Sequence, residues 1–489
     1  MSEALRSDDG QLAPQREPAG RLSVSQLLVY AAPAIGLHFT FMLMGLDFFK
    51  FATDVLRVAP ALLGVLVGVS RLWDAVSDPI AGYLSDRTRT RFGRRRPWMA
   101  AAALPFGASM VMLWSPPPGL TGGWVAVWVG VGLFLFYTAY TALMVPYGAL
   151  GAELSQDYHD RTRLFAWRYG VGAAGMLLGV GAFYLLLESA NPETAVMGLG
   201  ARELGRLVAF TSLVLMCATV AILVAHVRER PDYRDRGPQR VFAAFADVAR
   251  NPHARSLLGV QALHFFSVVT LSIGAAFLFQ HVMRVPSGVT AVLVACFALG
   301  TVCAIPLWVR VSSRFGKDRC WRAALWTVGV IYLLMFVSLR DGLDPSALAT
   351  VVMAVSALVL GAAQSSNFVL SHSMQADVID YDEYVTGERK EGAYLATWSF
   401  VEKCAGALAA VLVGAALQGV GYQPGADEQD AATRLTILGV MSLVPAACHF
   451  AAAVLLRGFG LGQAEHARIR HALDAGARAG LPPAGAQRP

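Results

Sequence analysis

The stretch Thr90-Arg-Phe-Gly-Arg-Arg-Arg-Pro-Trp98 returns in a related form as Ser313-Arg-Phe-Gly-Lys-Asp-Arg-Cys-Trp321. Five of the nine positions carry the same residue in both stretches. Each stretch lies between two apolar segments, at corresponding places in the first and second half of the chain. Parallel halves of this kind are typical of transporters built from internal repeats. The repeat therefore predicts a protein made of two similar halves.

The composition around these stretches is that of a membrane protein. Of the 489 residues, 55% are hydrophobic and 15% are charged, whereas soluble domains carry roughly 25% charged residues. The apolar residues are gathered in long runs rather than spread along the chain. This pattern excludes a soluble multidomain enzyme and indicates a polytopic membrane protein.

Twelve apolar stretches are long enough to cross about 30 Å of hydrocarbon as helices. Helices are the open-ended structure that satisfies backbone hydrogen bonds within lipid, so we expect an all-α polytopic membrane protein with two six-helix bundles. Pro33, Pro146 and Pro445 are expected to interrupt the first, fourth and twelfth spans. The spans are expected at 24–56, 59–84, 97–115, 123–153, 164–187, 206–227, 255–284, 287–311, 321–339, 346–374, 392–420 and 433–457.

The chain is accordingly expected to have five parts. A cytoplasmic tail precedes the N-terminal bundle, a central cytoplasmic loop joins the bundles, and a second cytoplasmic tail follows. After Gly460 this last tail has the pattern of a short basic amphipathic helix. The boundaries are 1–23, 24–227, 228–253, 254–458 and 459–489.

Loop charges predict the orientation. Six arginines lie between Arg87 and Arg96, while the next loop, SPPPGLTGG, has no charge. Because positive loops remain in the cytoplasm, the arginine loop and both termini are expected there. We expect a multi-pass protein of the cell membrane, in a bacterium the inner membrane, without a cleaved signal peptide.

Several other classes of function are excluded. The six cysteines show no CxxC spacing, so neither a disulfide framework nor a zinc site is expected. The net charge of +6 is explained by membrane orientation rather than by nucleic acid. No nucleophile and base pattern or phosphate-binding loop is present, so we expect no enzyme, no cofactor and no metal beyond a possible Na⁺.

Two aspartates inside the second span are the leading candidates for a functional site. Asp74 and Asp78 are four residues apart on one helical face, with Arg71 three residues before Asp74. Two carboxylates about 6 Å apart at an effective dielectric near 20 repel by about 2.8 kcal/mol, so they need a cation or a proton. The alternative interpretation is that Arg71 and other basic groups neutralise them to join helices. We favour function, since intramembrane acids are costly and rarely kept without a role.

A few further charges lie inside the spans. In span eleven, Lys403 is long enough to reach Asp74 or Asp78 across a central cavity and to link the halves, and the adjacent Glu402 points about 100° away. Asp47 and Lys50 in span one are spaced to neutralise each other, with a structural salt bridge as the alternative. The remaining candidates are His38 in span one and Arg168 in span five.

Aromatic residues and a cytoplasmic charge pattern complete the candidates. Aromatic rings inside spans can stack on a flat solute face, although ordinary helix packing is the competing interpretation. Asp377 and Asp380, between spans ten and eleven, are expected to pair with Arg94, Arg95 and Arg96 as a cytoplasmic gate, with a solvated acidic loop as the alternative. The aromatic candidates are Tyr140, Trp167, Phe368 and Trp398.

The run RLWDAVSDPIAGYLSDRTRTRFGRRRPW, with DVIDYDEYVTGERKEGAY and the SFVEK segment, resembles the glycoside-pentoside-hexuronide:cation symporters, the melibiose-permease-like branch of the major facilitator superfamily. The resemblance extends along nearly all spans. It implies twelve helices in the major facilitator fold, alternating access, and a small-molecule solute carried with Na⁺, Li⁺ or H⁺. It also implies a cation site of Asp74, Asp78 and the Thr141 hydroxyl, with Lys403 nearby.

The expected solute site departs from the galactoside-carrying members of that family. Positions where those members have acids are His38 and Met144 here, and a tryptophan position is Gly148. Residues that remain are Arg168, Tyr140 and an aromatic at Phe368. An α-galactoside is therefore not the expected solute, because carboxylates that hold sugar hydroxyls are missing.

Three functions stay open at this stage. The leading one is a cation-coupled symporter of a sugar or glycoside, acting as a monomer in the lipid bilayer. Related lysophospholipid symporters make an amphipathic solute the second alternative. A non-transporting membrane receptor on the same fold is the third.

Overall fold

The computed structural model describes residues 22–154, 158–189, 198–227, 229, 248–340, 347–388, 390–426 and 428–479. In this part of the chain every regular element is a helix. Twelve helical segments are long and apolar enough to cross a membrane. The predicted all-helical class and the number of spans are therefore confirmed, while the tail 1–21 and most of the central loop lie outside the described residues.

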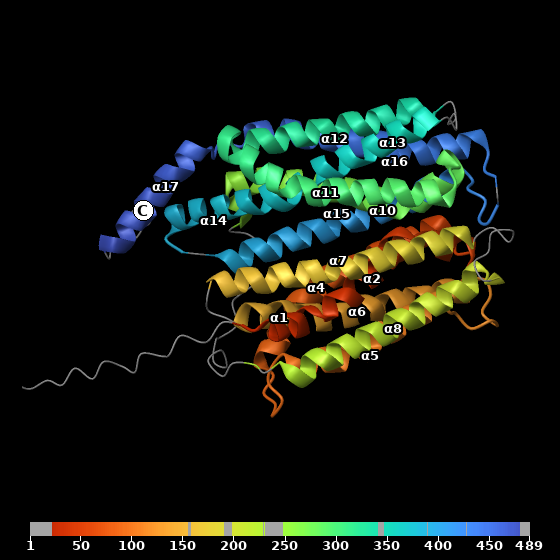
Figure 1. Ribbon diagram of the computed structural model, residues 1–489, viewed down its shortest axis with the longest axis horizontal. Coiled ribbons are helices and arrows are strands. Elements are labelled where there is room, and N and C mark those ends of the chain that lie inside the picture. Colours follow the sequence, from red (N-terminus) through yellow and green to blue (C-terminus); the bar gives the residue numbers. More distant parts are fainter. Residues whose placement is uncertain are drawn as a thin grey trace, which may run out of the picture.

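The helices of the N-terminal half form the lower layer in Figure 1. Local signals start several of them. A capping box between Ser23 and Gln26 starts α1, and proline at the first position starts α2 and α4, where its missing N–H leaves no donor unsatisfied. The elements are α1 (Val24–Ala31), α2 (Pro33–Leu46), α3 (Phe48–Asp54), α4 (Pro60–Arg87), α5 (Arg96–Trp114), α6 (Gly123–Leu154), α7 (Tyr158–Glu188) and α8 (Ala201–His226).

The C-terminal half forms the upper layer in Figure 1. Asn251 and Asp430 cap the first turns of its first and last spans by accepting hydrogen bonds from backbone N–H groups. Its elements are α10 (Pro252–Phe277), η3 (Leu278–Met283), α11 (Ser287–Phe315), α12 (Lys317–Leu339), α13 (Ala347–Gln364), η4 (Asn367–Ser371), α14 (His372–Thr386), α15 (Glu391–Gly419), α16 (Ala431–Leu455), η5 (Leu456–Gly458) and α17 (Gln463–Ala479).

Breaks within the spans fall partly where they were expected. The helix is interrupted next to Pro33, where α1 ends and α2 begins. The expected breaks at Pro146 and Pro445 are wrong, since α6 and α16 run through them. Neighbouring helices and small local adjustments accommodate such prolines within a bundle. The π-helical turns η3 and η4 interrupt the seventh and tenth spans instead, and no proline or glycine within these turns signals them.

The sequence repeat is also a structural repeat. Gly93 lies before α5 with φ of +110°, and Gly316 lies before α12 with φ of +90°. Side-chain-bearing residues rarely adopt this backbone region, so glycine is needed at both turns. Both halves therefore place a glycine with positive φ in the turn between their second and third spans.

The halves meet most closely where α4 packs along α15. Small residues allow this approach: a Cβ on Gly64 would lie 2.5 Å from the carbonyl oxygen of Ala410, and one on Gly414 would lie 2.3 Å from that of Pro60. Close contact between small residues is a common way for helices to associate in membranes. This contact joins the start of α4 to the end of α15, and the helices stay in contact further along, where Gly406 packs against Arg71.

Both ends of the described chain lie at the same end of the bundle. The backbone N–H of Leu22 donates to Asp160 near the start of α7, and α17 packs on α14 at the left of Figure 1. The expected helix after Gly460 is therefore present as α17. This end also carries the arginine loop, which is expected in the cytoplasm. The name cytoplasmic end is used below only to mean the end with this loop.

Candidate functional site

A charged centre joins α4 to α15. The Lys403 ammonium lies 2.9 Å from Asp74 Oδ2 and 2.5 Å from Asp78 Oδ2. It also donates to the backbone carbonyl of Asp74, over 3.1 Å. Asp74 is 4% exposed, so this centre is shielded from water on the Asp74 side. One lysine of the C-terminal half thus holds two carboxylates of the N-terminal half.

Hydroxyl groups complete the oxygen-rich side of this centre. Thr141 Oγ1 on α6 lies 2.7 Å from Asp74 Oδ1 and 3.1 Å from Asp78 Oδ1. Ser77 Oγ lies 3.1 Å from Thr141 Oγ1. Because a hydroxyl has a single proton, Thr141 donates fully to one carboxylate at a time. Two carboxylates and two hydroxyls form a set of hard oxygen ligands suited to Na⁺, Li⁺ or a proton.

Arg71 lies one helical turn before Asp74 and points at α15. A Cβ on Gly406 would lie 2.9 Å from its Nη1 atom, and its Nε atom is buried without a hydrogen-bond partner among the described residues. No ion pair between Arg71 and Asp74 is found among the described side chains. Lys403, rather than Arg71, therefore neutralises the two aspartates.

A second group of candidate residues surrounds Arg168 on α7. Its guanidinium carbon lies 4.5 Å from the centre of the Tyr147 ring, and its Nη2 atom lies 3.6 Å from Met144 Sδ. No acidic side chain within ion-pair distance is found for Arg168 among the described residues. His38 packs against Gly172 of the same helix, where an added Cβ would lie 2.0 Å from its Nδ1 atom. Arg168 therefore offers a cation with unused donors inside the N-terminal half.

The aromatic candidates lie in different surroundings. Tyr140 precedes Thr141 on α6 and packs on Phe41, with ring centres 4.8 Å apart. Trp398 is buried in a cluster of the C-terminal half, which leaves its ring face no room for a solute in this conformation. Phe368 at the start of η4 is 62% exposed. Of these rings, only that of Tyr140 borders the charged centre.

Asp47 and Lys50 form no direct ion pair among the described residues, although Lys50 is close enough for its charge to act on the Asp47 carboxylate. Lys50 forms its ion pair with Asp54, one turn further along α3. The helix breaks at Asp47, whose φ is −112°, so Asp47 is not in helical register with Lys50. Asp47 is buried, and its Oδ2 atom has no hydrogen-bond partner among the described residues. It lies apart from the charged centre.

The cytoplasmic arginines are held within their own half. Arg94 Nη2 lies 2.7 Å from Glu153 Oε1, and Arg95 Nη2 lies 2.5 Å from Asp86 Oδ1. The backbone N–H groups of Arg94, Arg95 and Arg96 donate to the Glu229 carboxylate, where a negative charge suits the start of α5.

The acidic candidates are likewise held by the C-terminal half. Lys317 Nζ lies 2.6 Å from Asp377 Oδ2, and His466 Nε2 of α17 lies 3.1 Å from Asp380 Oδ2. The expected gate between the arginines and these acids is thus not formed in this conformation by any described ion pair. Lys317 aligns with Arg94 in the repeat, and Asp377 is near the cytoplasmic end of the tenth span as Glu153 is of the fourth. Each half therefore repeats one ion pair, called a clasp below, which joins the start of its third span to the end of its fourth. The sequence prediction considered only pairs between the halves.

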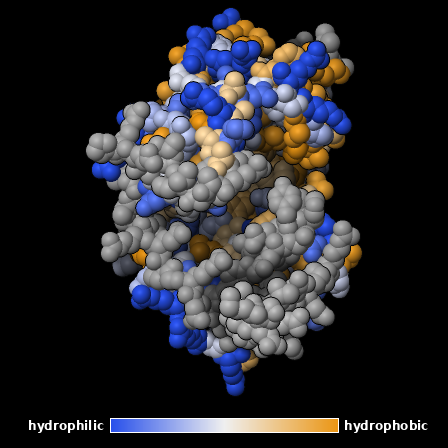
Figure 2. Space-filling view, turned by 90° about the vertical axis from the view of Figure 1, so that its left-hand side faces the viewer, coloured by the Kyte–Doolittle hydropathy of each residue, from blue (hydrophilic) through white to orange (hydrophobic). Residues whose placement is uncertain are grey.

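The opposite end of the bundle is closed by contacts between the halves. Tyr422, in the loop between α15 and α16, donates to Asp54 Oδ1 over 2.9 Å. His281 Nε2 lies 3.0 Å from the same hydroxyl, and Arg57 donates to the carbonyl of Pro424. No sequence signal pointed to this contact set, because its members come from segments that are far apart in the sequence. Figure 2 shows the cytoplasmic end, where the surface is hollowed between the halves.

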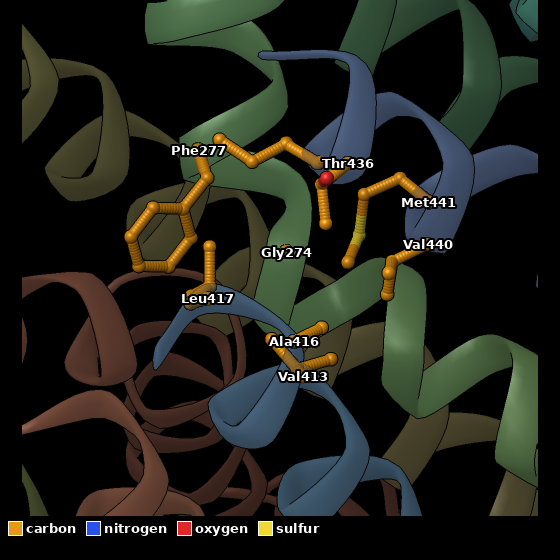
Figure 3. Close-up of a pocket in the computed structure, with 9 residues that line it drawn as sticks. Gly274, Phe277, Val413, Ala416, Leu417, Thr436, Val440 and Met441 are labelled. Atoms are coloured by element: carbon orange, nitrogen blue, oxygen red, sulfur yellow. The ribbon is translucent and has the colours of Figure 1, made fainter. Parts of the chain in front are cut away.

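A separate pocket lies within the C-terminal half, between α10, α15 and α16 (Figure 3). Its lining includes Gly274, Val413 and Met441, and Thr436 supplies the one side-chain oxygen drawn there. A polar solute would find few partners in it. The charged centre, rather than this pocket, is the candidate functional site.

Twelve spans in two similar halves, with a buried ion pair between them near mid-span, define the class of secondary membrane transporters. The chain belongs to the family of MFS/sugar transport proteins, whose sequence pattern matches residues 29–463.

The relatives of this chain are transport proteins. It is 27% identical to the inner membrane symporter YicJ of Escherichia coli over 443 residues, covering 90% of this chain and 92% of YicJ. It is 24% identical to the sodium-dependent lysophosphatidylcholine symporter 1 of Gallus gallus over 462 residues, covering 88% and 85%. The crystal structure of a D-xylose-proton symporter matches with a TM-score of 0.63 at 14% identity, covering 89% of this chain and 97% of that one. That likeness shows the major facilitator fold.

Proposed function

We propose that the protein is a cation-coupled symporter that carries a sugar or glycoside across the membrane by alternating access. The observation that carries the proposal is the Lys403 ammonium between the Asp74 and Asp78 carboxylates. Membership in a sugar transport family and similarity to a named symporter support the transported class.

Competition for the two carboxylates supplies the coupling. A monovalent cation bound by Asp74, Asp78 and Thr141 takes the same oxygens that Lys403 uses. Cation binding therefore weakens the ion pair that joins α4 to α15, and it frees the ammonium to meet a polar group of the solute. Linkage then requires that the solute raise cation affinity by the same factor as the cation raises solute affinity.

The N-terminal half supplies further groups for the solute. Arg168 has donors for a carboxylate or hydroxyl, while Tyr140 and His38 border the same half. Asp47, Phe368 and Trp398 have no contact that supports a solute role in this conformation.

The gate and the topology follow from the same scheme. The moving units are the bundles 24–227 and 254–458, and Arg94, Arg95 and Arg96 meet Asp377 and Asp380 when the cytoplasmic end closes. The termini are cytoplasmic in a bacterial inner membrane, as YicJ's name and the arginine loops support. A single chain supplies every group of the cation site, so a monomer is sufficient.

Uptake of radiolabelled glycosides into proteoliposomes tests the proposal, with imposed Na⁺, Li⁺ or pH gradients. We expect uptake to rise with one of these gradients and to lose that dependence in Asp78→Asn. Uptake indifferent to all three gradients would exclude the coupling.

An amphipathic solute is the second candidate. Met144 beside Arg168 makes this part of the site less polar, and a lysophosphatidylcholine symporter is among the relatives. Lysophosphatidylcholine that competes with glycoside uptake or shows its own cation-dependent uptake would favour it.

A further inference from the structure

Glu402 is an intramembrane carboxylate that the proposed cation site does not use. It lies near the middle of α15, directly before Lys403. Gln261 on α10 donates from Nε2 to Glu402 Oε1 over 2.8 Å, and Ser371 at the end of η4 donates to Gln261 Oε1 over 2.9 Å. Gln261 is 1% exposed and Ser371 is 2% exposed. Two buried side chains therefore fix the direction of this carboxylate.

The other carboxylate oxygen has no assigned partner. Glu402 Oε2 makes no hydrogen bond to any described residue, and the side chain is only partly buried. Leaving such an acceptor unused within a membrane is unfavourable. The geometry thus presents one oriented, available acceptor at the depth of the cation site.

Two consecutive residues on α15 contact different halves of the protein. Lys403 reaches α4 of the N-terminal half, whereas Glu402 is held by Gln261 of α10, which in turn is held by Ser371 of η4. The π-helical turn η4, which carries Ser371, is of a kind that often marks functional sites. Asn367 in the same turn is buried with its Oδ1 atom unpartnered among the described residues.

Near the charged centre, the candidate solute residues of the opposite half include no acid, since Asp47 lies apart from it. His38, Tyr140, Met144 and Arg168 offer donors, a ring and a thioether, while Asp74 and Asp78 are occupied by Lys403 and Thr141. A carboxylate is the strongest side-chain acceptor for a solute hydroxyl. Among the described side chains near this depth, Glu402 is the carboxylate that has an oxygen without a hydrogen-bond partner.

We propose that Glu402 is a solute-binding residue, which accepts a hydrogen bond from a hydroxyl of the carried sugar or glycoside through Oε2. This rests on the proposed function for the class of solute. Gln261 and Ser371 are positioning residues that orient the carboxylate. Solute held by Glu402 and cation held beside Lys403 then act on neighbouring residues of one helix, which provides a short route for coupling.

Ligand binding to the purified full-length protein tests this assignment. The probes are methyl β-D-glucuronide, methyl β-D-xyloside and lysophosphatidylcholine, titrated with and without Na⁺ by calorimetry and thermal unfolding. The variants are Glu402→Gln, Glu402→Ala and Ser371→Ala. Glu428→Gln is the control, since Glu428 is an exposed acid in an ion pair with Arg284.

We expect at least one glycoside to bind the wild type and Glu428→Gln with equal affinity. Its Kd should rise about 10-fold or more in Glu402→Gln and Glu402→Ala, as for a lost charge-assisted hydrogen bond. Ser371→Ala should raise Kd by a smaller factor. Because Glu402 is intact in this variant, Ser371→Ala still tests the assignment if the Glu402 variants do not fold. Stabilisation by Na⁺ alone should remain within about twofold in every variant.

Unchanged glycoside affinity in the Glu402 variants would overturn the assignment. So would a wild type that responds to Na⁺ but to neither glycoside, or only to lysophosphatidylcholine. Glycoside binding that depends on Glu402 but not on Na⁺, Li⁺ or pH would support the assignment while refuting the proposed cation coupling.

Discussion

Lys403 faces two carboxylates with one ammonium group. Its Nζ atom lies within 2.9 Å of Asp74 and Asp78, on a helix of the opposite half. Desolvated charges of this kind are stable only while they are paired. Any event that removes one member therefore changes how firmly the halves are joined.

Replacement of Asp78 by Asn should abolish cation dependence. The amide keeps the shape but removes one of the two negative charges that a cation would meet. We expect Na⁺ or Li⁺ to stabilise the variant at least about 10-fold more weakly than the wild type, measured as the cation concentration for half-maximal thermal stabilisation. Asp318→Asn is the control, because Asp318 pairs with Arg322 outside the centre.

Replacement of Lys403 by Ala should expose the repulsion between the carboxylates. We expect the free energy of unfolding to fall by about 1–3 kcal/mol, less than for a fully buried pair because Asp78 is partly exposed. Na⁺ should restore more stability to this variant than to the wild type, since the ion replaces the missing cation. Lys390→Ala, at a more exposed ion pair, should show neither effect, and equal Na⁺ responses would contradict the competition scheme.

The contents of the charged centre could be predicted from the sequence because so few charges lie inside the spans. Asp74 and Asp78 share one helical face and require a cation, and Lys403 is long enough to reach them. The structure brings the three residues together. Thr141 came from resemblance alone, since nothing in its spacing distinguishes it from other hydroxyls. The ion pair of Lys50 with Asp54 was not predicted, because a helix break at Asp47 leaves no mark in the spacing.

At the scale of elements, α4 and α15 touch through their backbones. A Cβ on Gly64 would lie 2.5 Å from the Ala410 carbonyl oxygen, so a larger residue there separates the helices. We expect Gly64→Leu to open the closed end and reduce uptake, as measured by distances between spin labels on the two halves. Gly181→Leu is the matched control, because a Cβ added at Gly181 would meet no atom within 4 Å; equal effects would contradict this role.

The clasp of the C-terminal half, between Lys317 and Asp377, can be tested by exchanging the two charges. Lys317→Asp and Asp377→Lys each break the pair of α12 and α14, while the double variant restores it in reverse. We expect a coupling energy of about 0.5–1 kcal/mol from a double-mutant cycle in thermal stability, since Lys317 is partly exposed. Additive effects of the two changes would exclude the pair.

Element positions were largely predictable, whereas their irregularities were not. Length and hydropathy place the spans because lipid leaves few alternatives to a helix. The π turns η3 and η4 contain neither proline nor glycine, so no residue in them predicts the irregularity. Pro146 and Pro445 were wrongly predicted to interrupt their spans, because neighbouring helices allow α6 and α16 to continue through a proline.

At the scale of the whole molecule, the contacts at the closed end define which way the protein faces. Burial, and next the negative charge of Asp54, raise the pKa of Tyr422. A raised pKa means that the phenol keeps its proton, and its hydrogen bond to Asp54, throughout the physiological range. Spin-label distances across this end should therefore show no Tyr422 transition between about pH 6 and pH 9, whereas Tyr422→Phe should widen them at every pH.

The two-half organisation was visible in the repeat, but the conformation was not. A sequence that must adopt several states specifies pairings for each of them, so the arginine and acid runs predicted a gate that this state does not contain. Contacts such as that of Asp54 with Tyr422 join residues 368 positions apart, and spacing along one chain carries no trace of them.

The repeated clasps bear on how the protein is made. Arg94 with Glu153, and Lys317 with Asp377, tie each half to itself. The first six spans can therefore reach their final arrangement while the ribosome is still producing the rest. Two separately translated polypeptides, divided in the central loop, should assemble in the membrane into a working protein.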